Sequence, residues 1–154
     1  MGHHTFRLRL SDSLAGTSGS EPALATGNPP LLERLSDTGV WEQQDASLST
    51  PPFRLYLFSL LLCMRFHLVR EANAQGIPLH QLQATFTAEA SEHWDLERLS
   101  VAVQMTLDPA ASAEASARAD VPALAAIRER MERCPVVRNL PATTACHIHL
   151  ALAS

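Results

Sequence analysis

The sequence predicts an α+β domain, and three observations support this prediction. The first is a long apolar helix within residues 51–76. The second is a pair of neighbouring segments, 81–88 and 99–106, in which apolar and polar residues alternate. The third is a shorter helix that is followed by a last alternating segment at 143–152. Helices and strands in this order, with two neighbouring strands forming a hairpin, are typical of an α+β layout.

The long helix is the central element of the prediction. Residues 53–69 contain no Gly or Pro and are apolar except at Arg54, Ser59, Arg65 and His67. A helix that is apolar nearly all round must be buried. A membrane span needs roughly 20 mainly apolar residues, and this run is shorter and interrupted. We therefore expect the core helix of a soluble domain.

Local signals define both ends of this helix. Ser49 or Thr50 is expected to cap its start, with Pro51 and Pro52 in the first turn, where a missing N–H costs little. Gly76 is expected to end it, because glycine readily adopts the left-handed conformation that terminates helices.

Alternating segments predict the strands. Residues 5–10 should form a half-buried strand, and residues 81–88 and 99–106 should form a hairpin with one apolar face. We expect the central helix to pack on that face. Residues 143–152 should form the closing strand.

A second helix is predicted after Asp120, which can cap it. Pro135 disfavours helical backbone at the preceding residue, so the helix should end at Cys134. Residues 108–119 are rich in Ala and Ser and form either a short helix capped by Asp108 or a surface segment. The apolar stripe of the second helix comprises Leu124, Ile127, Met131 and Cys134.

The chain length suits one domain, 1–154, with a core at 51–154 and an atypical N-terminal region of strands and loops at 1–50. Within the N-terminal region, residues 11–20 are expected to be a loop, and residues 22–25 are a short apolar segment. The irregular part that follows includes a polar run at 42–50, expected to be a linker.

Composition limits the function. The 12 basic residues, all Arg, and 16 acidic residues give a net charge of −4, so neither nucleic acid nor a membrane is an expected partner. The N-terminus lacks the apolar run of a secretory signal, so we expect a cytoplasmic protein. Three cysteines in that reducing compartment indicate buried or catalytic thiols rather than structural disulfides. Neither zinc nor dinucleotide motifs occur, and no bound cofactor or metal is expected.

Two cysteines stand in a distinctive context. Pro52 precedes Cys63 by eleven residues and Gly76 follows it by thirteen, while Cys134 begins a Cys-Pro-Val motif. This arrangement over residues 51–154 resembles the OsmC/Ohr family, the osmotically induced protein C-like and organic hydroperoxide resistance proteins. The resemblance implies a curved antiparallel sheet packed around the central helix that carries Cys63, with the second helix ending at Cys134, and an intertwined homodimer.

The resemblance also implies an enzyme: a peroxiredoxin-like thiol peroxidase that reduces small organic hydroperoxides in oxidative stress defence. Cys63 would be the peroxidatic residue and Cys134 the resolving one. A small dithiol or lipoyl-type reductant would regenerate the thiols. The end of a helix disfavours a thiolate, which would keep Cys134 protonated.

The sequence departs from the family at one position. In active members a Glu directly follows the helix-opening Pro, and here that position holds Phe53. The family's N-terminal Arg has no match among Arg7, Arg9 and Arg34, and Arg54 points about 100° further round the helix than Phe53. These departures leave a second interpretation open. The chain would then be a catalytically degenerate protein of the same fold that binds a small apolar ligand or a protein partner.

His67 and Arg54 are the candidate auxiliary residues. Ser59, Cys63 and His67 are spaced four residues apart, so they lie near one line on the helix, and a cationic His67 would favour a thiolate at Cys63. The alternatives are a purely structural His67 and an inert core thiol at Cys63.

The closing strand carries the remaining candidate residues. His147 and His149 share one strand face without a third ligand spaced to complete a metal site, so we expect them to face solvent. Cys146 falls on the apolar face of the same strand and is expected in the core.

Overall fold

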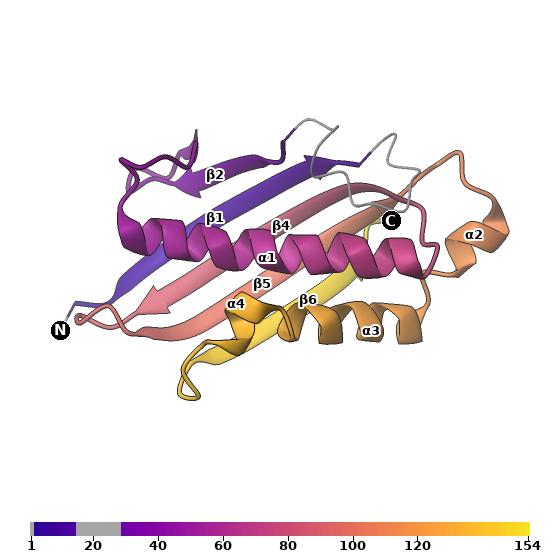
Figure 1. Cartoon of the computed structure of the whole chain (residues 1–154). Coiled ribbons are helices and arrows are strands. Elements are labelled where there is room, and N and C mark those ends of the chain that lie inside the picture. The colour runs from indigo at the N-terminus through magenta and orange to yellow at the C-terminus, as the bar shows by residue number, and fades with distance from the viewer. Residues whose placement is uncertain (1, 15–28) are drawn as a thin grey trace.

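The computed structural model describes residues 2–14 and 29–154 and confirms the α+β class (Figure 1). A sheet of six strands carries a long helix and three shorter ones. The strands are β1 (His4–Ser13), β2 (Leu31–Leu35), β3 (Trp41–Gln43), β4 (Leu79–Ala90), β5 (Leu96–Leu107) and β6 (Ala145–Leu152). The helices are α1 (Pro52–Ala74), α2 (Ala113–Ala117), α3 (Val121–Glu132) and α4 (Pro135–Arg138).

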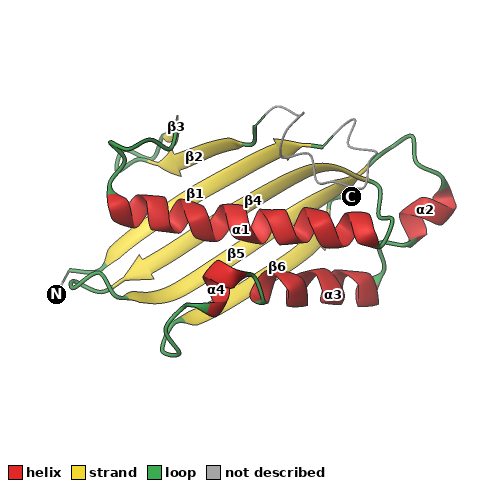
Figure 2. Ribbon diagram, viewed as in Figure 1, coloured by secondary structure: helices red, strands yellow, loops and turns green. Residues whose placement is uncertain are grey.

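The strands are ordered β3-β2-β1-β4-β5-β6 across the sheet (Figure 2). All neighbours are antiparallel except β5 and β6, which are parallel. The expectation of a wholly antiparallel sheet is therefore wrong at this edge. The reason is topological, because the chain leaves β5 and returns through α3 and α4, and such a crossover places the next strand parallel to the last.

Helix α1 lies across the sheet, and α3 and α4 lie beside it on the same face (Figure 1). With 23 residues, α1 is long and apolar enough to cross a membrane by length and composition alone. The expectation that this helix is too short for a span is therefore wrong. Packing accounts for its apolar character instead. Leu57, Leu61, Met64 and Leu68 are buried in the core that α1 forms with the sheet.

The ends of α1 confirm one prediction and correct another. Gly76 has a φ of 66°, and its N–H donates to the carbonyl of Asn73, so it ends the helix as expected. The predicted side-chain cap at Ser49 or Thr50 is absent, and Pro51 occupies the N-cap position. Thr50 Oγ1 instead accepts a hydrogen bond from the backbone N–H of Ser47. Pro52 at the first helical position removes one donor that a cap would otherwise satisfy.

The central hairpin is confirmed. β4 and β5 are longer than the alternating segments that predicted them, and Phe86 pairs with Val101 in a register that places both side chains in the core. Gln83 and Gln104 pair on the opposite face, which no helix covers in the described part of the chain (Figure 2). The period-two pattern therefore identified the buried face correctly.

The N-terminal region is more ordered than the sequence indicated. β1 continues to Ser13, beyond the predicted end at residue 10, because it pairs with β4 along its whole length. β2 and β3 lie where an irregular segment was expected, with β3 extending into the predicted linker. Both are short strands on one side of the sheet. The apolar segment 22–25 lies outside the described residues.

The smaller helices refine the remaining predictions. Asp120 caps α3 as expected, because its Oδ1 accepts from the N–H of Ala123 at 2.9 Å. A short helix does occur within 108–119, but Ser112 rather than Asp108 caps it. The predicted second helix ends earlier than expected, at Glu132, and Cys134 is the N-cap of the separate helix α4.

Candidate active site

Cys63 and Cys134 come together where α1 faces the junction of α3 and α4. Cys63 is half-buried in the middle of α1, and Cys134 is fully buried. The stripe on α3 brings them together, since Ile127 and Met131 are also buried in the same core. The Cys63 thiol lies close enough to Cys134 to raise the pKa of Cys134, so the two residues that the sequence singled out as a pair are neighbours in the fold.

The two thiols are not equivalent. The pKa of Cys134 is raised to about 12, mainly by burial and in part by the neighbouring Cys63. A thiol whose pKa lies so far above neutrality keeps its proton at physiological pH. The arrangement thus assigns Cys134 the role of a protonated partner beside the more exposed Cys63.

The cause of this protonation differs from the one expected. The sequence predicted that a helix C-terminus would hold the proton on Cys134. Instead, Cys134 is the N-cap of α4, and its Sγ accepts a hydrogen bond from the backbone N–H of Val137 at 3.4 Å. That hydrogen bond lowers the pKa of Cys134, so burial opposes the cap and outweighs it.

His67 lies on the same side of α1 as Cys63, one turn along the helix. Burial lowers the pKa of His67, and the positive charges of Arg70 and Arg130 lower it further. Arg130 of α3 also forms an ion pair with Glu71 at 3.2 Å, so His67 lies where α1 meets α3. A neutral imidazole is therefore favoured at pH 7, and any help that a cationic His67 gives to Cys63 is restricted to more acidic conditions.

This restriction gives a testable expectation for His67→Gln. Because the pKa of His67 lies below its ordinary value of about 6.5, the variant should match the wild-type rate of peroxide consumption at pH 8 to 9. It should be slower only near or below pH 6, where wild-type His67 becomes charged and a thiol most needs a cation to ionise. Rates are measured across this range with dithiothreitol held in excess. Identical profiles for the two proteins would leave His67 with a structural role alone.

Phe53, at the position of the family's Glu, belongs to an aromatic cluster at the start of α1. Its ring centroid lies 5.3 Å from that of Trp94, 5.5 Å from that of Phe6 and 6.0 Å from that of Tyr56. Rings at such distances attract one another and bury apolar surface. Sequence analysis did not find Trp94, because it stands in the turn between β4 and β5 with a positive φ of 68° and belongs to no periodic pattern.

The candidate arginines are not placed beside Cys63 on α1. Arg54 precedes Cys63 by nine residues, which is two and a half helical turns. Its side chain therefore projects from the side of α1 opposite to Cys63. Of the N-terminal arginines, Arg9 pairs with Glu33 at 2.7 Å, and the positive charge of Arg34 acts on Arg54 and lowers its pKa. The structure thus brings Cys63, Cys134 and His67 to one side of α1 and places Arg54 on the other.

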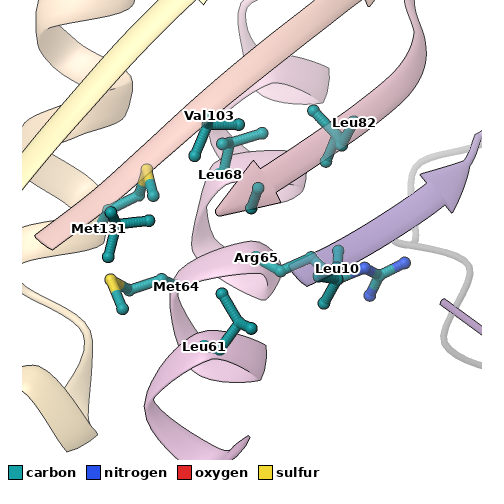
Figure 3. Close-up of a pocket in the computed structure, with 10 residues that line it drawn as sticks. Leu10, Leu61, Met64, Arg65, Leu68, Leu82, Val103 and Met131 are labelled. Atoms are coloured by element: carbon teal, nitrogen blue, oxygen red, sulfur yellow. The ribbon is translucent and has the colours of Figure 1, made fainter. Parts of the chain in front are cut away.

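A small apolar cavity lies between α1 and the sheet (Figure 3). Its volume is about 10 Å³, which is close to the space of one water molecule. Its lining includes Leu61, Met64 and Leu68 from α1, Val103 from β5 and Met131 from α3. Sites for small organic ligands are typically about 300 Å³ or larger, so this cavity does not provide the apolar ligand site of the second interpretation.

The remaining candidates lie on β6. His147 and His149 are exposed, and Cys146 is half-buried on the other face of the strand, where burial raises its pKa. Among the residues that the structure describes, no group of three metal-ligating side chains was found.

Comparison with known proteins supports the fold at low sequence identity. No protein-family model and no curated protein matches the sequence. A solved protein from Psychrobacter arcticus 273-4, described as an osmotic stress induced and detoxification response protein, is similar with a TM-score of 0.53 and 13% identity, over 78% of this chain and 87% of that one. An OsmC like protein from Mycoplasma pneumoniae is similar with a TM-score of 0.50 and 17% identity, over 80% and 89%.

These similarities define the class of the structure. The chain has the OsmC-like fold, in which a long central helix packs on a six-stranded sheet, and the resemblance seen in the sequence is confirmed at the level of the fold. At 13% and 17% identity a shared fold does not establish a shared activity, which must be argued from the site.

Proposed function

We propose that the protein is a thiol-dependent peroxidase that reduces small organic hydroperoxides through Cys63 and Cys134. The observation that carries this proposal is the proximity of a half-buried thiol, Cys63, to a fully buried one, Cys134. Two neighbouring thiols with different exposure suit a two-step reaction. The more exposed thiol reacts with the peroxide, and the buried thiol then reacts with the oxidised product. The partner thiol, Cys134, is held in its protonated form by burial.

The reaction would proceed in three balanced steps. The Cys63 thiolate attacks the outer oxygen of the hydroperoxide, the O–O bond breaks, and the alkoxide leaves as an alcohol after taking a proton from water. Cys63 becomes a sulfenic acid. The Cys134 thiol then attacks its sulfur, water leaves and a disulfide forms. A small dithiol, such as a lipoyl-type compound, reduces this disulfide by exchange and is itself oxidised to a cyclic disulfide.

The absence of a carboxylate at residue 53 is expected to affect the rate of peroxide reduction rather than the sequence of chemical steps. A carboxylate at residue 53 could orient an arginine or the peroxide, and the aromatic cluster around Phe53 leaves no such group there. The proposal therefore depends on the two thiols, on their different burial and on the proton that burial holds on Cys134. An inert core pair would show the same proximity but no turnover.

The test is consumption of cumene hydroperoxide by the purified protein with excess dithiothreitol. We expect the peroxide to disappear at a rate proportional to protein concentration and well above that of dithiothreitol alone. A rate no higher with protein than without it would reject the enzyme and favour the binding protein. Hydrogen peroxide serves as a comparison substrate, because apolar surroundings at the site should favour the organic peroxide.

We also propose that the protein is a homodimer. The face of α1 that points away from the sheet retains apolar side chains, among them Leu62, which is 39% exposed, and the half-buried Leu55 and Phe66. A second copy related by a twofold axis would cover this face with the same residues. Light scattering at micromolar concentration should give twice the chain mass of 16.8 kDa, and a single-chain mass would contradict the dimer.

A further inference from the structure

Helix α1 directs two arginines toward the sheet, and they have different surroundings. Arg65 extends toward β1 beside Leu10 (Figure 3), and its Nε donates to the buried carboxylate of Asp12 at 2.5 Å. Arg54 lies one turn before Leu57 and so begins the same sheet-facing side of the helix. In the part of the chain that the structure describes, Arg54 has no carboxylate partner, and its buried Nε has no hydrogen-bond acceptor.

A second arginine, Arg34 on β2, faces the helix from the sheet. Arg34 on β2 pairs in register with Leu8, whose side chain is fully buried on the face that α1 covers. The Nη2 atom of Arg34 reaches Glu42 at 3.4 Å, but the Nε of Arg34 is buried without an acceptor, as is that of Arg54. The charge of Arg34 acts on Arg54, and the two guanidinium groups lie on facing surfaces of β2 and α1 with an unused N–H on each.

This arrangement is unfavourable without a counter-charge. Burial lowers the pKa of Arg54, and the positive charge of Arg34 lowers it further. Each buried N–H without an acceptor adds the cost of its lost hydration. Asp12 resolves the same problem at Arg65, whereas among the described residues Arg54 has no carboxylate partner and Arg34 pairs only with the half-exposed Glu42.

We propose that Arg34 and Arg54 form a binding site for a doubly charged oxyanion of the phosphate type. Two guanidinium groups, of which only Arg34 has a carboxylate beside it, the half-exposed Glu42, suit a dianion. Each can donate through Nε and a terminal nitrogen in the forked geometry that arginine uses for phosphate. The site lies on the opposite side of α1 from Cys63, so it is separate from the proposed peroxidase site. The ligand is either free phosphate or the phosphate group of a larger molecule.

The experiment compares thermal unfolding in phosphate and in chloride at equal ionic strength and pH. Inorganic phosphate at a concentration well above its dissociation constant should raise the Tm of the wild type by about 4 °C. Arg54→Met and Arg34→Gln should each lose most of this rise, because each leaves one guanidinium. Arg98→Met removes an exposed arginine paired with Glu89 and should behave like the wild type. Phenyl phosphate replaces inorganic phosphate to distinguish a free anion from a phosphate monoester.

Titration calorimetry on the wild type gives an independent measurement, with one phosphate expected per chain. No rise in Tm with either phosphate compound, or an equal rise in all four proteins, would overturn the site. A rise with acetate but not with phosphate would overturn the assignment to a dianion. Since neither measurement involves peroxide, the outcome is independent of the proposed peroxidase activity.

Discussion

Cys63→Ser should lower the rate of organic hydroperoxide reduction on the order of a thousandfold or more. The reason is that a serine hydroxyl at neutral pH neither forms a useful nucleophile nor accepts oxygen from a peroxide, whereas a thiolate does both. Fold and stability should change little, because the substitution replaces one half-buried atom. Peroxide consumption under excess dithiothreitol measures the effect, with circular dichroism to confirm that the variant is folded.

The matched variants separate the roles of the cysteines. Cys134→Ser should retain the first step and lose the second, so a sulfenic acid should accumulate at Cys63 and react with dimedone. Cys146→Ser should keep the wild-type rate, because Cys146 lies on β6 and is not part of the pair. Retention of full activity by Cys63→Ser would show that the reaction does not pass through this residue.

Arg65→Met should lower the free energy of unfolding by about 3–5 kcal/mol, the second large effect that the structure predicts. The Asp12 side chain is 1% exposed and that of Arg65 is 12% exposed, so removing the arginine leaves a buried carboxylate without its partner. The pair also links α1 to β1, two elements far apart in the sequence. Urea unfolding followed by circular dichroism gives the difference in free energy.

Two controls define the origin of that loss. Arg98→Met breaks an exposed pair with Glu89 and should cost less than about 1 kcal/mol. The double variant Asp12→Asn and Arg65→Met should recover part of the stability, because the remaining amide carries no buried charge. If Arg65→Met cost no more than Arg98→Met, the ion pair would contribute nothing that depends on its burial.

Much of the fold could be predicted because its signals are local. Alternation along residues 81–88 and 99–106 identified the buried face of the hairpin, and Gly76 and Asp120 identified one end each of the two main helices. β2 was missed because it is stabilised by pairing with β1, which is distant along the chain, as the pairs Ser11 with Leu31 and Leu8 with Arg34 show. The direction of β6 depends on the path of the crossover before it and has no sequence signal of its own.

In the candidate site too, features with local sequence signals could be predicted, and features that depend on distant contacts could not. The spacing of apolar residues along α3 was sufficient to place Cys134 against α1, and the structure brings it to Cys63. The surroundings of Phe53 could not be predicted, because Trp94 reaches it from a turn. The approach of Arg34 to Arg54 was also hidden, since it depends on β2 being a strand whose Arg34 side faces the helix.

Peptide mapping after oxidation tests the redox pair most directly. The reduced protein is treated with one equivalent of cumene hydroperoxide, free thiols are alkylated, and the digest is analysed by mass spectrometry. The proposed mechanism predicts a disulfide that joins Cys63 to Cys134 within one chain, with Cys146 alkylated. Cys63 recovered in its alkylated form, with Cys146 or no cysteine oxidised, would contradict it.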